Sequence, residues 1–312
     1  METQLKSERN GQINIVLQDR HIMRSHHESV QQEQKKDPFT NIDQAFTSFI
    51  GLHDLKQSIK EIYAVKMINE KRGNFGLKHT NQVLHMLFKG NPGTGKTTMA
   101  RKLAELYHNM NLLSKGHLIE AERADLVGEY IGQTAQKTKA IVKKAMGGIL
   151  FVDEAYSLGR GGEKDFGKEA IDTLVKHMED HHNDFVLILA GYPYEMERFL
   201  TLNPGLKSRF PFIVEFKDYD TEQLIEIAER MAQEREYKLT REAKWVLKAQ
   251  IKQELLQKKI NFANARYIRN IIEHAIRMQA MRLMMHNHVS HEDLIHLTAP
   301  DFKLDTLKSL SE

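Results

Sequence analysis

The residues whose types and spacing point most clearly to chemistry form one glycine-rich run: Gly90, Asn91, Pro92, Gly93, Thr94, Gly95, Lys96, Thr97 and Thr98. The run matches G-x-x-x-x-G-K-[ST], in which the glycines let backbone N–H groups turn toward phosphate oxygens and a following helix N-terminus adds positive potential. Lys96 supplies a mobile charge for the β- and γ-phosphates, and the Thr97 hydroxyl can ligate Mg²⁺. The run therefore predicts a site for a nucleoside triphosphate with Mg²⁺.

Two neighbouring carboxylates, Asp153 and Glu154, follow an apolar run at residues 148–152. In a triphosphate hydrolase, one carboxylate holds Mg²⁺ through its water shell, and a second orients and deprotonates the attacking water. Strands commonly end in solvated acids, so the pair alone is weak evidence. Beside the glycine-rich run it predicts hydrolysis, with Asp153 serving the metal and Glu154 the water.

The elements that must position these residues are visible as short apolar runs that alternate with helical patterns. The runs cover residues 83–88, 148–152, 185–190 and 212–216, and the first run is followed by a helical pattern at Met99, Leu103 and Leu106. Continuous apolar strands between helices are typical of a parallel sheet covered on both faces. The sequence thus predicts an α/β fold with the glycine-rich run between a strand and a helix.

The character of the chain changes after residue 216, where the strand signals stop. Helical periodicity continues over residues 221–235, 241–258 and 265–285, with Asp220 or Thr221 available as the first N-cap. Residues near the N-terminus are polar and lack a periodic apolar face. We expect a flexible arm over residues 1–40, an α/β nucleotide-binding domain over 41–216 and a helical lid over 217–312.

The composition excludes several classes of protein. Of the 312 residues 41% are hydrophobic, enough for a core, and the absence of cysteine excludes disulfides and thiolate zinc sites. The formal charge of +3 comes from 45 basic and 42 acidic residues without a long block of one sign, so no nucleic acid partner is expected. The apolar runs fall far short of the ~20 residues that cross a bilayer. We expect a cytoplasmic protein without membrane partners.

Five segments together resemble the AAA+ ATPases. They read GNPGTGKTT, ILFVDEAY, LAGYPYEM, NPGLKSRF and NARYIRNIIEHA, and the resemblance covers about residues 42–303. The wording is most similar to the branch that unites a bacterial sporulation ATPase with the red-type Rubisco activases. The resemblance implies a P-loop NTPase fold, with a five-stranded parallel sheet in a three-layer αβα domain and a C-terminal all-α lid. It also implies ATP with Mg²⁺ and assembly into a homo-oligomer, usually a hexameric ring.

The resemblance assigns roles to two arginines. Arg209 matches the arginine finger, which reaches into the ATP site of the neighbouring subunit and so acts in trans. Arg266 matches the second-sensor arginine of the lid, which touches the γ-phosphate within its own chain, and Arg269 is the nearby competitor for that role.

Three further positions are matched less closely. Many members place Asn after the fourth strand, where this chain has Tyr192, so either the Tyr192 hydroxyl replaces the amide or another group does that work. The turn before residue 55 resembles the adenine-contacting turn, which would put Ile50 and Gly51 against the base. An ordinary glycine turn is the alternative there.

The triplet Tyr130, Ile131 and Gly132 matches the pore loop of the family, which grips an extended polypeptide. An aromatic ring with few rotatable bonds can hold any peptide backbone through apolar contact, and the glycine lets the loop swing. In the alternative interpretation, Tyr130 packs beneath its own loop.

These features together predict a Mg²⁺-dependent ATPase ring that remodels or threads a protein client. By resemblance, its setting is bacterial spore maturation, in the mother cell, with a Rubisco-activase-like remodeler as the alternative. Two alternatives belong to other classes: a nucleic-acid motor or loader, and a scaffold switched by nucleotide.

Overall fold

The structure is a computed structural model of the chain that describes residues 37–47, 49–80, 82–161, 165–201, 204–256, 262–286 and 288–302. The arm expected over residues 1–40 lies outside the described residues except for residues 37–40. Residues 42–312 form a single unit by their internal contacts. The following description concerns that unit.

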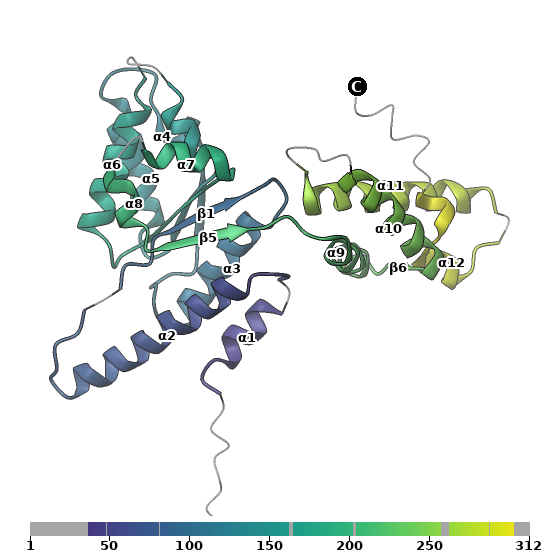
Figure 1. The fold of residues 1–312 in the computed structure, drawn as a ribbon, viewed down its shortest axis with the longest axis horizontal. Helices are drawn as coiled ribbons and strands as arrows, with labels where there is room; N and C mark the ends of the chain where they lie inside the picture. The colour runs from purple at the N-terminus through teal and green to yellow at the C-terminus, as the bar shows by residue number, and fades with distance from the viewer. Residues whose placement is uncertain are drawn as a thin grey trace, which may run out of the picture. The chain divides into compact units, whose positions relative to one another are not determined.

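A sheet of five parallel strands forms the centre of the α/β part, with β1 and β5 side by side in Figure 1. The strand order is β2-β3-β4-β1-β5. The strands are β1 (Met86–Gly90), β2 (Leu118–Ala121), β3 (Ile149–Val152), β4 (Val186–Gly191) and β5 (Phe212–Phe216). The three inner strands are buried along their whole length, as their continuous apolar runs predicted. The structure confirms the expected five-stranded parallel sheet.

Helices cover both faces of this sheet, with α3 on the opposite side from α5 and α6 (Figure 1). The elements are α1 (Thr40–Phe46), α2 (His53–Asn74), α3 (Lys96–Asn109), α4 (Arg123–Leu126), α5 (Gln133–Ala145), the 3₁₀ turn η1 (Ala155–Gly159), α6 (Gly167–Asp180), α7 (Pro193–Thr201) and α8 (Pro204–Arg209). The connection after β1 runs toward β2 at one edge, whereas the connection after β4 runs toward β5 at the other. Neighbouring strands whose connections diverge leave a crevice at their carboxyl ends, where ligands bind in open α/β sheets.

The lid is helical and has its own apolar core, which includes Leu224, Leu247 and Ile268. Its elements are α9 (Thr221–Gln233), α10 (Arg241–Leu256), α11 (Asn264–Met284), α12 (His291–Ile295) and η2 (Ala299–Phe302). Asp220 is the N-cap of α9, and it exchanges hydrogen bonds of 2.8 and 3.0 Å with Gln223 in a capping box. The periodicity did not predict one feature of the lid: the two-residue strands β6 (Lys238–Leu239) and β7 (His296–Leu297) pair in parallel.

None of the helices that the structure describes combines the length and apolar character needed to cross a membrane. The two longest, α2 and α11, carry charged residues along their length.

Candidate nucleotide site

The glycine-rich run leaves the buried strand β1 and enters α3, as its sequence predicted. Gly93 and Gly95 adopt left-handed backbone angles, with φ of +70° and +94°. Only glycine takes such angles without steric cost, so these positions require it. A Cβ at Gly93 would also lie 2.2 Å from the carbonyl oxygen of Ala263, so this loop packs directly against the backbone that precedes α11.

The Lys96 ammonium lies inside the loop. Its Nζ donates to the carbonyl oxygens of Gly90 at 2.8 Å and Asn91 at 2.9 Å. Burial lowers the pKa of Lys96, and the nearby carboxylate of Asp153 opposes that shift. The ammonium thus lies within the turn of backbone that is shaped for phosphate, and it is held there by carbonyl groups.

The two acids meet this loop from the end of β3. Asp153 accepts a 2.9 Å hydrogen bond from the Glu154 N–H, which fixes the first carboxylate against the backbone of the second residue. Glu154 has a φ of +45°, in the left-handed region that costs a non-glycine residue about 1–2 kcal/mol. Strain of this kind gathers at functional sites, and it is consistent with a carboxylate whose placement matters.

A cavity of about 690 Å³ brings most of the predicted site residues together. Its lining includes Ile50, Pro92, Gly93, Gly95, Lys96, Thr97, Thr98, Asp153, Glu154, Tyr192, Arg266 and Arg269. Other predicted residues do not line it: Gly51, Gly90, Asn91 and Thr94, together with Arg209 and the triplet at 130–132. Gly90, Asn91 and Thr94 shape the loop, since Thr94 Oγ1 donates to the Asn91 carbonyl at 2.8 Å.

The cavity is also lined by residues of the lid and of the turn before α2, and most of them were not identified from the sequence. The apolar ones are Phe49, Ile227 and Met231, and the charged ones are Arg230, Glu234, Arg235 and Glu273. Apolar side chains in the same cavity as a phosphate loop suit the flat base of a nucleotide. The helical periodicity of 221–235 predicted the helix but not that one of its faces borders a ligand cavity.

Arg266 and Arg269 enter the cavity from the first turns of α11. The positive charge of Arg266 is close enough to lower the pKa of Lys96, although burial has the larger effect. Among the described residues, none forms an ion pair with either arginine. Both guanidinium groups are therefore available to an anionic ligand, and the choice between them as second sensor stays open.

Tyr192 follows β4 and stacks on Tyr156, with ring centroids 5.7 Å apart and planes at 29°. Burial raises the pKa of Tyr192, and the negative charge of Glu154 raises it further. The pKa of Tyr156 is raised by the same two causes in the same order. Both phenols therefore keep their protons at neutral pH and can donate, and Tyr156 is a neighbour of the acid that the motifs did not identify.

Arg209 lies at the end of α8, outside the cavity of its own chain. Its Nε donates to Glu179 Oε1 at 3.0 Å, and its Nη1 donates to the Gly205 carbonyl at 2.6 Å. The structure thus does not bring this arginine together with the other predicted site residues. Any contribution from it to an ATP site requires another copy of the chain.

The triplet at 130–132 lies on a surface loop between α4 and α5. The side chains of Tyr130 and Ile131 are 68% and 88% exposed, and Gly132 has a φ of +81°. Tyr130 therefore does not pack beneath its own loop, which was the alternative interpretation. Two large apolar groups stand in solvent at the point where the glycine turns the chain into α5.

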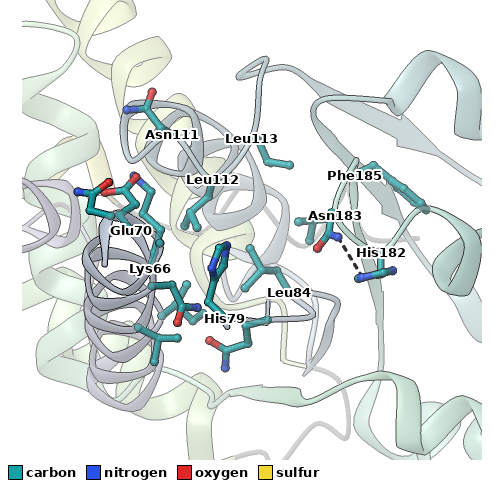
Figure 2. A pocket seen from close by; sticks show the side chains of 17 residues that line it. Lys66, Glu70, His79, Leu84, Asn111, Leu112, Leu113, His182, Asn183 and Phe185 are labelled. Atoms are coloured by element: carbon teal, nitrogen blue, oxygen red, sulfur yellow. Dashed lines mark hydrogen bonds and ion pairs between the residues drawn. The ribbon is translucent and has the colours of Figure 1, made fainter. Parts of the chain in front are cut away.

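A second cavity, of about 430 Å³, lies beside α2 and the start of β4 (Figure 2). Lys66 and Glu70 line it on the α2 side, and His182 and Asn183, which share a 3.0 Å hydrogen bond, line it from the α6–β4 turn. Lys66 forms an ion pair with Glu70 at 2.7 Å. None of the predicted site residues lines this cavity, which is at the opposite end of the strands from the phosphate loop.

Comparison with known proteins identifies the class of protein to which this fold and site belong. Residues 86–218 match the model of the ATPase family associated with various cellular activities (AAA), and residues 220–312 match the AAA lid domain. The chain is 52% identical over 313 residues to Stage V sporulation protein K of Bacillus subtilis (strain 168), with 97% of each chain covered. The protein belongs to the AAA family of ATPases, and the predicted resemblance is confirmed.

Two other similarities agree with this membership. The chain is 46% identical over 243 residues to the chloroplastic ribulose bisphosphate carboxylase/oxygenase activase of Cyanidioschyzon merolae. The alignment covers 78% of this chain and 82% of the activase. The AAA domain of FIGL-1, solved in complex with ADP, superposes with a TM-score of 0.55 at 18% identity, over 82% of this chain and 81% of that one. The structural similarity concerns the fold alone. The family makes this protein a nucleotide-binding ATPase, and its members typically form ring oligomers.

Proposed function

We propose that this ATPase works as a Mg²⁺-dependent homo-hexameric ring that remodels or threads a protein client. The exposed pair Tyr130 and Ile131 is the observation that carries the proposal. Leaving two large apolar side chains in water on one loop has no stabilising effect within the chain, whereas it suits apolar contact with another polypeptide. The flexible Gly132 beside them lets the loop change position.

The proposed chemistry follows from the groups that line the cavity. The Thr97 hydroxyl and the Asp153 carboxylate are oxygen donors, the ligand type that Mg²⁺ prefers, so the residues present fit the ion. Bound there, Mg²⁺ would neutralise charge on the β- and γ-phosphates. Glu154 takes the proton of the attacking water, while Lys96 and Arg266 hold the γ-phosphate. Tyr192 is suited to orient that water or phosphate by donating a hydrogen bond from its hydroxyl group.

The remaining assignments extend this picture. Ile50 and Gly51 would contact the adenine, Arg209 would complete the site of the neighbouring subunit, and the domain boundaries at 41 and 217 remain predictions. The setting we propose is spore maturation in the mother cell, supported by the 52% identity to Stage V sporulation protein K. A Rubisco-activase-like remodeler is the alternative within the branch, supported by the 46% identity to the Cyanidioschyzon merolae activase.

A client trap tests the proposal. Glu154→Gln, expressed in the organism that encodes the protein, should hold ATP and retain its client, and the same variant with Tyr130→Ala should release it. Proteins enriched only when Tyr130 is present are then purified and added to the wild-type ATPase. We expect them to stimulate hydrolysis by the wild type and not by Tyr130→Ala.

Three outcomes would contradict the proposal in different ways. Recovery of nucleic acid in place of protein would favour a nucleic-acid motor or loader. Equal recovery with and without Tyr130 would remove the loop from client binding. ATP-dependent assembly with no turnover, even with candidate clients, would favour a scaffold switched by nucleotide.

A further inference from the structure

A buried amide connects the phosphate loop to the lid. Asn264, the first residue of α11, is fully buried. Its Oδ1 accepts from the Tyr219 N–H at 2.9 Å, and its Nδ2 donates to Asp218 Oδ1 at 2.7 Å. The same Nδ2 lies 2.9 Å from the Phe262 carbonyl oxygen. Both ends of this amide are therefore used: Oδ1 by the hinge before α9, and Nδ2 by the hinge carboxylate and the Phe262 carbonyl. The Nδ2 also donates to the Pro92 carbonyl of the phosphate loop at 3.3 Å.

Asp218 carries this connection onward to the phosphate loop. Its two carboxylate oxygens accept from Asn91 Nδ2 at 3.0 and 2.9 Å. Asn91 in turn provides one of the carbonyl oxygens that hold the Lys96 ammonium. A continuous chain of polar contacts thus runs from the loop, through the hinge carboxylate, to the first residue of the helix that carries Arg266.

Two backbone contacts run parallel to this chain. The Ala265 N–H donates to the Gly93 carbonyl at 3.1 Å, and the Tyr219 hydroxyl donates to the Thr94 carbonyl at 3.0 Å. Hydrogen bonds therefore fix the loop at Asn91, Gly93 and Thr94 from outside. These contacts hold the loop backbone from the lid side, while the Lys96 ammonium holds it from within through the Gly90 and Asn91 carbonyls.

Asparagine meets two demands at position 264 that aspartate and glycine do not meet together. The backbone there has a φ of +46°, a left-handed angle that asparagine, aspartate and glycine accept more readily than other residues. The side chain must also donate to a carboxylate while it accepts from an N–H. Aspartate cannot donate when ionised, and glycine has no side chain.

We propose that Asn264 and Asp218 are positioning residues for nucleotide: they hold the phosphate loop in its binding shape and set Arg266 at the cavity. The inference rests on the nucleotide site proposed above. Neither side chain lines the cavity, so their effect on ATP would pass through the loop residues they contact, Asn91 and Pro92, and through the start of α11.

The test measures the Kd of ADP and of a non-hydrolysable ATP analogue by calorimetry, with the thermal midpoint recorded for each variant. Asn264→Gly keeps a residue that accepts the positive φ but removes the four side-chain contacts. We expect its Kd to rise about tenfold or more, the scale of one charge-assisted hydrogen bond. Gln279→Ala is the matched control, because Gln279 is a buried amide of the same helix that donates only to carbonyls within the lid.

A merely structural role for Asn264 predicts that Asn264→Gly behaves like Gln279→Ala, with a lower thermal midpoint and an unchanged Kd. That result would overturn the inference. Asn91→Ala removes the loop end of the same connection from a partly exposed position, so it tests the inference even if Asn264→Gly does not fold. It should raise the Kd by a similar factor, and an unchanged Kd would also overturn the inference.

The double variant Asn91→Ala with Asn264→Gly should lose less binding than the sum of the two single losses, because the route through Asp218 is common to both, although only Asn264→Gly removes the contact with Pro92. Fully additive losses would contradict action through that carboxylate. Lys96→Ala separates the two proposals. If Lys96→Ala leaves the Kd unchanged, the nucleotide site itself is misplaced. If Lys96→Ala loses binding while Asn264→Gly binds as the wild type does, only the positioning role is refuted.

Discussion

The backbone of Glu154 lies in the left-handed region, which is strained for a residue other than glycine. The fold holds it there between Asp153 and the buried turn η1. Its neighbours are the paired rings of Tyr156 and Tyr192, and its charge raises the pKa of both phenols after burial has done so. The backbone of this glutamate is held in place, whereas its side chain is exposed and lines the cavity. Removing the charge alone is therefore an informative change.

Glu154→Gln preserves the shape of the residue and removes only its ability to take a proton. We expect ATP binding to stay within about threefold of the wild type and the hydrolysis rate to fall by about 10²-fold or more, the usual contribution of a general base. Calorimetry and a phosphate-release assay measure the two quantities. Glu61→Gln, on α2 away from the cavity, is the control; near-normal hydrolysis by Glu154→Gln would remove the assignment.

Which residues could be predicted from sequence follows from how local their roles are. The glycine-rich run and the Asp153–Glu154 pair can be recognised in the sequence because their chemistry depends on residues that are neighbours in the chain. Asp218 and Asn264 could not be predicted from spacing, because their significance arises from a hydrogen bond between segments far apart in the chain. The one available signal was an asparagine directly before the Ala-Arg of the matched lid motif.

Among the elements, the centre of the sheet contains a buried histidine that is hydrogen-bonded on both of its ring nitrogens. His85 precedes β1 and is 1% exposed. Its Nδ1 accepts from the Leu187 N–H of β4 at 3.0 Å, and its Nε2 lies 3.5 Å from the Met178 carbonyl oxygen of α6, to which it donates. Burial lowers the pKa of His85 to about 4. Protonation would turn Nδ1 into a donor that faces another donor.

The linkage gives this histidine a definite effect on stability. Below pH 6.5 the unfolded chain binds a proton at His85, whereas the folded chain does not bind it until about pH 4. The contribution of neutral His85 to the free energy of unfolding is therefore complete above pH 6.5 and declines as the pH falls through this window. Each pH unit costs up to about 1.4 kcal/mol in the free energy of unfolding. His85→Gln offers an amide oxygen and an N–H but does not titrate.

We therefore expect the loss of stability between pH 6.5 and 4.5 to be smaller in His85→Gln than in the wild type by about 2 kcal/mol. Urea unfolding followed by circular dichroism at several pH values measures the difference. The exposed His288→Gln serves as the control and should follow the wild type. Parallel curves for the wild type and His85→Gln would mean that the pKa of His85 is the same in the folded and the unfolded chain, which would contradict the effect of burial.

The elements that the sequence predicted well are those with a clear apolar run or a long helical period. The run at 212–216 coincides with β5, and the predicted lid helices agree with α9, α10 and α11 to within a few residues. The edge strand β2 was not delimited in advance, because it is only four residues long and mostly half-exposed. The pair β6–β7 has two residues in each strand, too few for any periodicity to appear.

At the scale of the whole molecule, the predicted site residues are divided between two places. The cavity holds the predicted lysine, acids and lid arginines, whereas Arg209 does not line it and is bound to Glu179 and the Gly205 carbonyl. In a ring, every subunit presents one surface to the site of the next, so a finger outside the cavity of its own chain can complete a site only across a heterologous interface. Action in trans would require Arg209 to exchange Glu179 for a phosphate.

Mixing two inactive variants tests whether Arg209 completes the site of a neighbour. Lys96→Ala lacks an intact site but keeps the finger, and Arg209→Ala has the reverse defect. In a randomly mixed ring at equal amounts, roughly a quarter of the interfaces would pair an intact site with an intact finger. ATP hydrolysis should therefore rise well above that of either variant alone. Arg198→Ala, an exposed arginine on α7, should hydrolyse ATP normally without mixing. If differently tagged variants co-purify as mixed rings and hydrolysis still stays at the level of the single variants at every ratio, Arg209 acts only within its own chain, where Glu179 already holds it.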